Sequence, residues 1–163
     1  MSLLPGAELD PHGVEPLGVS EPPARPGSPN ALPHRVYTSR HWLFEEQPEK
    51  RLAVLSRTPA VWSSLAELRA ENETILGLLR DDQRGCGLLV DMREAPIRND
   101  PEFEDAMAEL RQRLTSHFER TSILLESEIG ELQVTRLERD ERRPTTVTTR
   151  SESTALKFLL GGK

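Results

Sequence analysis

Six polar side chains gather within ten residues near the middle of the chain, and they are the strongest candidates for chemistry. The set is Asp91, Arg93, Glu94, Arg98, Asn99 and Asp100. Carboxylates and guanidinium groups in one loop could form an acid–base site, a docking patch for a protein partner, or a turn that simply faces water. We expect Asp91 and Arg93 to face opposite sides of the strand exit and to form no close pair.

No other residues have the spacing of a catalytic or metal site. The histidines are spread along the chain without metal-ligand spacing, at His12, His34, His41 and His117. Cys86 has no partner cysteine, and zinc needs three or four convergent donors. The segment Gly85-Cys86-Gly87 comes before an apolar run, whereas a phosphate-binding loop follows a strand and opens a helix. We therefore predict no enzymatic activity, no cofactor and no metal.

The elements around the six polar residues are the clearest in the sequence. The unbroken apolar run from Gly87 to Met92 is typical of a strand whose two faces are both covered. A helix from about 100 to 118 follows, capped by Asn99 or Asp100 and with Pro101 in its first turn;. The apolar stripe of this helix recurs at three- and four-residue steps: Phe103, Met107, Leu110 and Leu114;.

The same alternation continues toward the C-terminus. A strand at 121–125 is followed by a helix from about Ser127, with Ile129, Leu132 and Leu137 as its apolar positions. The loops after the strands ending near 92 and 126 then share one rim of a parallel sheet. A weaker strand at 145–149 suits a sheet edge. A short helix capped by Ser151 comes last, and Gly161 stands where a left-handed C-terminal cap is expected.

The first half of the folded region predicts a hairpin and a helix. One β-like run extends from Val36 to Phe44 and a second from 52 to 55, with a polar stretch between them;. Ser64 and Glu67 have the spacing of a capping box, which starts a helix that reaches about Arg80;. Trp42 and Trp62 are most simply core residues, although an exposed Trp would make a binding hot spot. The predicted order is ββαβαβα, an α/β fold with a mixed sheet.

Composition separates an N-terminal arm from this domain and limits the partners. Residues 1–34 are rich in Pro and Gly, which predicts a flexible, disordered arm, and residues 35–163 form the α/β domain;. The net charge is −6, with acids and bases interspersed, so we expect no nucleic-acid partner;. No stretch is long and apolar enough to span a bilayer and no leader is visible, so we expect a cytoplasmic protein without a membrane partner.

The run Leu88-Leu89-Val90-Asp91-Met92, the loop after it and the helix 100–118 resemble the STAS-like domains, the fold of bacterial anti-sigma-factor antagonists. The resemblance covers roughly residues 35–160. In signalling members of the family, a Ser or Thr in this loop is phosphorylated. The loop here has no hydroxyl residue, so the resemblance leaves Asp100 or Glu94 as a permanent negative charge, or Asp100 as a plain helix cap.

These observations favour a non-catalytic module that recruits a protein partner through the six polar residues or through a helix face. One alternative is a phosphorylation-controlled antagonist of a signalling partner that uses Ser122 or Ser127 in place of the missing loop hydroxyl. Another is a small-ligand carrier or minor enzyme that uses the same loop.

Overall fold

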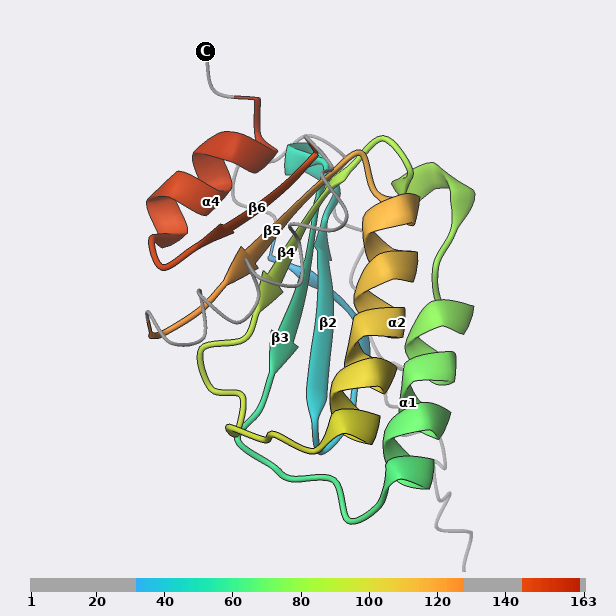
Figure 1. Ribbon diagram of the computed structural model, residues 1–163. Helices are drawn as coiled ribbons and strands as arrows, with labels where there is room; N and C mark the ends of the chain where they lie inside the picture. The colour runs from blue at the N-terminus through green and yellow to red at the C-terminus, as the bar shows by residue number, and fades with distance from the viewer. Residues whose placement is uncertain (1–31, 128–144, 162–163) are drawn as a thin grey trace, which may run out of the picture.

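A computed structural model describes residues 32–127 and 145–161 of the chain. These residues form a six-stranded mixed sheet with helices on both faces (Figure 1). The strands are β1 His34–Thr38, β2 Trp42–Gln47, β3 Leu52–Arg57, β4 Gly87–Asp91, β5 Arg120–Leu124 and β6 Thr146–Thr149. The helices are α1 Leu65–Gly77, α2 Pro101–His117 and α4 Glu152–Leu159. The predicted α/β class is confirmed.

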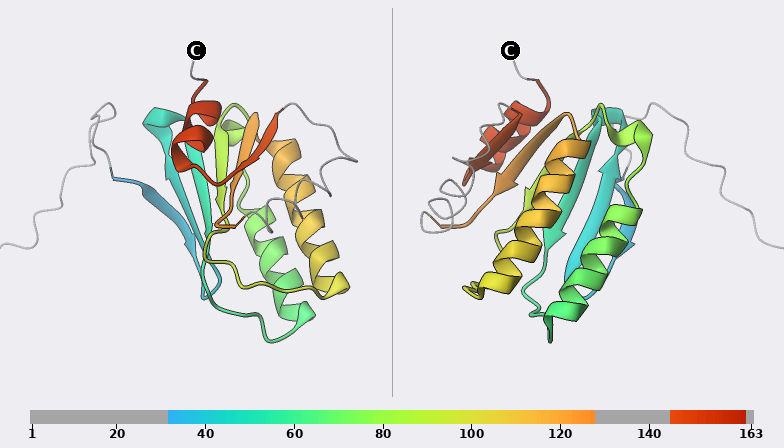
Figure 2. Two further views of the ribbon diagram at one scale, coloured as in Figure 1. Left: turned by 60° about the vertical axis from the view of Figure 1, so that its left-hand side comes forward. Right: turned by 45° about the vertical axis from the view of Figure 1, so that its right-hand side comes forward.

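The strands lie in the sheet in their chain order, from β1 to β6. The pairs β1–β2 and β2–β3 are antiparallel, and the pairs from β3 to β6 are parallel. Each of α1 and α2 connects two neighbouring parallel strands, and both cover the same face because successive crossovers have the same hand. Helix α4 packs on the opposite face (Figure 2). The carboxyl ends of β3, β4 and β5 therefore meet along one rim.

Strand β4 is buried on both faces, as its unbroken apolar run predicts. Leu88 and Val90 join the large core under α1 and α2. Leu89 belongs to a smaller cluster under α4, together with Leu124 and Leu159. Full burial of one such side chain stabilises the fold by about 1.5–3 kcal/mol. The two clusters fix the register of β4, since a slip of one residue would exchange its faces.

The helix ends follow the sequence signals closely. The Ser64 hydroxyl accepts a hydrogen bond from the Glu67 N–H at 3.1 Å, as predicted. The Glu67 carboxylate accepts instead from the Ser63 N–H and hydroxyl, both at 2.6 Å, so the predicted capping box is only half formed. Gly161 has a φ of +68° and confirms the left-handed cap after α4. Helix α1 ends at Gly77, three residues before the predicted end.

The start of the sheet differs from the prediction. The run from Val36 to Phe44 forms two strands, not one, because the chain turns at Ser39. The Ser39 N–H donates to the Trp42 carbonyl at 2.8 Å, and the Ser39 hydroxyl accepts from the His41 and Trp42 N–H groups at 3.0 and 2.9 Å. The predicted order ββαβαβα therefore has one strand too few at its start, and its four strands are two fewer than the six of the described sheet. The predicted edge strand is confirmed as β6. Residues 1–31 of the predicted arm 1–34 lie outside the described residues, and so does the helix predicted from about Ser127, except for Ser127 itself.

Candidate functional site: a cavity beneath the rim loop

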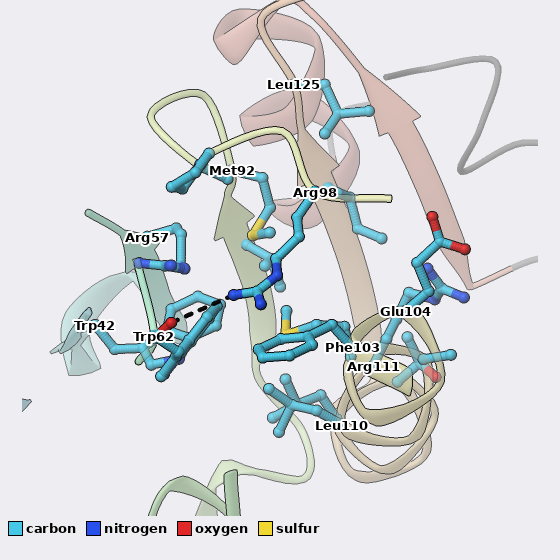
Figure 3. Close-up of a pocket in the computed structure, with 18 of the residues that line it drawn as sticks. Trp42, Arg57, Trp62, Met92, Arg98, Phe103, Glu104, Leu110, Arg111 and Leu125 are labelled. Carbon is cyan, nitrogen blue, oxygen red and sulfur yellow. Dashed lines mark hydrogen bonds between the residues drawn. The ribbon is translucent and has the colours of Figure 1, made fainter. Parts of the chain in front are cut away.

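An apolar cavity of about 240 Å³ lies between α2 and the sheet (Figure 3). Its sheet side is formed by Val90 from β4 and by Thr121, Ile123 and Leu125 from β5 and the residue after it. The loop from Met92 to Asp100, here called the rim loop, closes it at the carboxyl ends of the strands with Met92, Ala95, Pro96 and Arg98. The cavity is therefore assembled from at least three separate parts of the chain.

Helix α2 lines the cavity both with its buried stripe and with a second stripe beside it. Phe103, Leu110 and Leu114 are buried in the core, at 2–9% exposure, as the sequence predicts. The residues that turn toward the cavity repeat at three- and four-residue steps along the helix: Glu104, Met107, Ala108, Arg111 and Thr115. Residues at this spacing share one helix face. The cavity thus follows the axis of α2, which contributes the charged side chains of Glu104 and Arg111 to its lining.

A buried arginine stands at one end of the cavity. Arg57 is 3% exposed, and its guanidinium centre lies 3.7 Å from the ring centroid of Trp62. It donates hydrogen bonds to the carbonyl oxygens of His41 at 2.9 Å, Thr58 at 2.7 Å and Ala60 at 2.6 Å. Desolvation by burial lowers the pKa of Arg57 to about 10, although the negative charge of Glu71 acts in the opposite direction. Arg57 therefore remains a cation at neutral pH.

Glu71 of α1 organises the residues behind Trp62. Its carboxylate accepts a hydrogen bond from Trp62 Nε1 at 2.7 Å and lies 2.8 Å from His41 Nδ1. The hydroxyls of Ser39 and Tyr37 also donate to this carboxylate. The side chains of His41 and Ser39 each bind Glu71 and do not bind each other, so they do not form a nucleophile–base pair. The cluster instead fixes Trp62 as a wall of the cavity.

Arg98 spans the mouth of the cavity between Trp62 and Phe103, as Figure 3 shows. Its guanidinium centre lies 3.4 Å from the Phe103 ring centroid, and its Nη1 donates to the Trp62 carbonyl at 3.3 Å. Its Nε donates to the Asp100 carboxylate. Asp100 occupies the N-cap position of α2, but its backbone carbonyl accepts the first helical N–H groups and its side chain pairs with Arg98. The rim loop is thereby joined to α2 and to the segment before α1.

The structure separates the six polar residues of the rim. Arg98 lies at the mouth of the cavity and pairs with Asp100, whereas Asp91 pairs with Arg93, which also pairs with the start of α4. Arg93 Nη2 lies 2.7 Å from Asp91 Oδ2, and Arg93 Nη1 lies 3.2 Å from Glu152 Oε2. Our expectation that Asp91 and Arg93 form no close pair is wrong, because residues two apart along an extended chain face the same side. Glu94 and Asn99 are exposed.

The two serines considered for phosphorylation lie in different environments. Ser122 is 0% exposed within β5, so its hydroxyl reaches a kinase only if the strand opens. Ser127 follows β5 and is exposed. The tryptophans are both buried, Trp42 at 1% and Trp62 at 8% exposure. The prediction that they are core residues is confirmed, and the alternative of an exposed binding hot spot is wrong.

The Asp91–Arg93 pair gives a prediction for pH dependence. Burial raises the pKa of Asp91, but hydrogen bonds from the Arg93 side chain and N–H outweigh it, so the pKa lies below its ordinary value. The ion pair therefore stabilises the folded protein above pH 3.9, which is about the pKa of an aspartate in the unfolded chain. This stabilisation is lost as the pH falls through the lower pKa of Asp91 in the folded protein. We predict that Asp91→Asn lowers the free energy of unfolding by less than about 1 kcal/mol at pH 7.

This difference between Asp91→Asn and the wild type is expected to shrink as the pH falls below about 3.9, and urea unfolding at pH 7 and at about pH 3 measures it. Equal differences at both pH values would show that the ion pair does not stabilise the fold.

The described residues show neither a cluster of metal-binding side chains nor a membrane-spanning helix. Within residues 32–127 and 145–161, no three His, Cys, Asp or Glu side chains converge as metal ligands would. None of the described helices is long and apolar enough to cross a membrane. Comparisons of this chain with protein-family models, with curated proteins and with solved structures find no match.

Proposed function

We propose that this domain is a non-catalytic binding module that holds a small apolar molecule in the cavity between α2 and the sheet. The observation that carries the proposal is the cavity itself, about 240 Å³ in volume and walled mainly by aliphatic and aromatic side chains. An apolar cavity of about 150 Å³ is enough to hold one benzene molecule. Filling such a space with a ligand replaces missing van der Waals contacts and removes apolar ligand surface from water.

The charged groups near the cavity favour binding over catalysis. Asp91 pairs with Arg93 and Asp100 pairs with Arg98, so two of the three carboxylates that the sequence offers as acid–base groups in this loop are already in ion pairs. The proposal includes a STAS-like fold for residues 35–160. The resemblance depends on a strand, a loop and a helix in succession. The described structure has this succession in the buried strand β4, the rim loop and α2, which supports the proposed fold.

Titration with neutral apolar probes tests the proposed function. We expect 1-octanol or indole to raise the melting temperature of the full chain by several degrees at ten times its Kd, where binding adds about 1.4 kcal/mol. Ala108 lines the cavity from α2, so Ala108→Phe is expected to fill it and to weaken binding at least tenfold in calorimetry.

The matched control is Ala70→Phe, which makes the same change at an exposed position of α1. This variant is expected to bind the probes like the wild type. Absence of any binding to the wild type, or equal binding by Ala108→Phe, would contradict the proposal.

A protein-docking function is the second candidate, and one observation favours it. Ile97 in the rim loop is 90% exposed, and Val61, which lines the cavity, is 53% exposed. Apolar side chains on a charged loop are typical anchors for a partner. This candidate predicts that Ile97→Ser weakens co-purification with a partner and leaves octanol binding unchanged. Ala108→Phe is expected to weaken octanol binding and to leave co-purification unchanged.

A further inference from the structure

The charged residues around the cavity indicate that its ligand has a charged group beside its apolar part. This inference rests on the proposed function. We infer that the ligand is a compact apolar carboxylate whose acidic group binds Arg57 and Arg98 at the Trp62 end of the cavity. The two guanidinium groups both contact Trp62: Arg57 over its ring at 3.7 Å and Arg98 at its carbonyl oxygen at 3.3 Å.

The charge of the cavity wall is opposite to that of the chain. The lining residues include three arginines, Arg57, Arg98 and Arg111, and one acidic residue, Glu104. The whole chain has a net charge of −6. A positive wall in an acidic protein favours a negatively charged ligand, because charges act more strongly in a site partly shielded from water.

Arg57 is a buried cation without an ion-pair partner in the part of the chain that the structure describes. Each of its close hydrogen bonds goes to a backbone carbonyl oxygen. The negative charge of Glu71 acts on Arg57, but the Glu71 carboxylate already binds Trp62 and His41. Buried cations are usually paired, since desolvation of an isolated charge is costly. A ligand carboxylate at this end of the cavity would supply the missing counter-charge.

Arg98 has hydrogen-bonding capacity left for such a group. Its Nε donates to Asp100 and its Nη1 to Trp62, while its Nη2 has no hydrogen-bond partner among the described residues. Guanidinium groups bind carboxylates with two parallel hydrogen bonds where geometry allows. Because the Arg98 side chain is 33% exposed, it can meet the acidic group where the cavity opens to solvent.

The volume sets the size of the apolar body. The cavity, at about 240 Å³, is less than twice the roughly 150 Å³ that holds benzene;. By the same ratio it has room for about ten carbon atoms, which is a medium-length acyl chain or a fused aromatic ring. A membrane lipid with two long chains does not fit.

Calorimetric titration of the full chain with matched probes tests the inference. The aliphatic series is octanoate, 1-octanol and octylamine, and the aromatic pair is indole-3-carboxylate and indole. We expect each carboxylate to bind at least tenfold more tightly than its neutral analogue, and octylamine to bind most weakly. If octanoate binds more tightly than indole-3-carboxylate, the apolar part of the ligand is aliphatic; if it binds less tightly, that part is aromatic.

Two variants assign the preference to the arginines. Arg98→Met and Arg57→Lys are expected to reduce the preference for octanoate over octanol several-fold while octanol still binds. Arg84→Met, which removes an exposed cation outside the cavity lining, is expected to keep the preference. Arg57→Lys retains the charge in case a neutral replacement fails to fold.

The outcomes separate this inference from the proposed function. If octanol and octanoate bind equally, the carboxylate inference is wrong and the apolar binding function stands. If the preference persists unchanged in both arginine variants, the inference is also wrong. If no probe binds, both are wrong.

Discussion

Replacement of Glu71 by alanine is expected to lower the free energy of unfolding by about 3–5 kcal/mol, which is the usual cost of removing one partner of a buried ion pair. Glu71 is 8% exposed, and its carboxylate binds His41 Nδ1 and Trp62 Nε1. Without it these donors lose their acceptor inside the protein, and Arg57 loses the stabilising negative charge of Glu71;. Urea unfolding at pH 7 measures the loss.

Glu73 on the same helix provides the matched control. Its carboxylate lies 3.3 Å from Arg113, but the two side chains are 68% and 51% exposed. Glu73→Ala is expected to change the free energy of unfolding by less than about 1 kcal/mol. If Glu71→Ala costs no more than this control, the Glu71 cluster does not support the wall of the cavity.

The second large effect is expected from Phe103→Ala, at about 3–5 kcal/mol of unfolding free energy. Phe103 is 9% exposed in the core, and its ring lies under the Arg98 guanidinium at 3.4 Å. The substitution leaves a cavity and also removes the surface on which Arg98 rests. Thermal and urea unfolding measure the stability of this variant.

Ile97→Ala in the adjacent rim loop is the comparison for Phe103→Ala. Since Ile97 is 90% exposed, its truncation is expected to stay within about 0.5 kcal/mol of the wild type;. A loss for Phe103→Ala that is no greater would mean that α2 does not pack on the sheet through this residue.

The parts of the fold that local sequence signals define were predicted well. The unbroken apolar run 87–92 forms the buried strand β4, and Asp100 with Pro101 marks the start of α2. The stripe of Phe103, Leu110 and Leu114 is buried. These signals depend on residues close together in the chain, where periodicity and capping chemistry act directly.

The features that the sequence did not reveal depend on contacts between distant residues. Ser39 looks like part of a strand, but hydrogen bonds of its N–H and hydroxyl groups with His41 and Trp42 turn the chain between β1 and β2. Glu71 lies on an otherwise unremarkable helix, and its partners Ser39 and His41 are about thirty residues earlier in the chain. No local pattern indicates that these side chains meet.

The cavity is the clearest example of this limit. The sequence drew attention to the charges of the rim loop, and one of them, Arg98, borders the cavity. The apolar walls come from residues such as Met107 and Ile123, which read as ordinary core positions in their own elements. A void in a core arises from the spacing of the packed elements, which a pattern of apolar residues does not specify.

Intermolecular nuclear Overhauser effects between bound 1-octanol and the isotope-labelled protein test the central claim most directly. The proposed site predicts contacts from the probe to the side chains of Met107, Ala108 and Ile123, which lie between α2 and the sheet. Contacts confined to the exposed Ile97 and Leu160, with none to those three residues, would show that the probe binds only at the surface and would contradict the account.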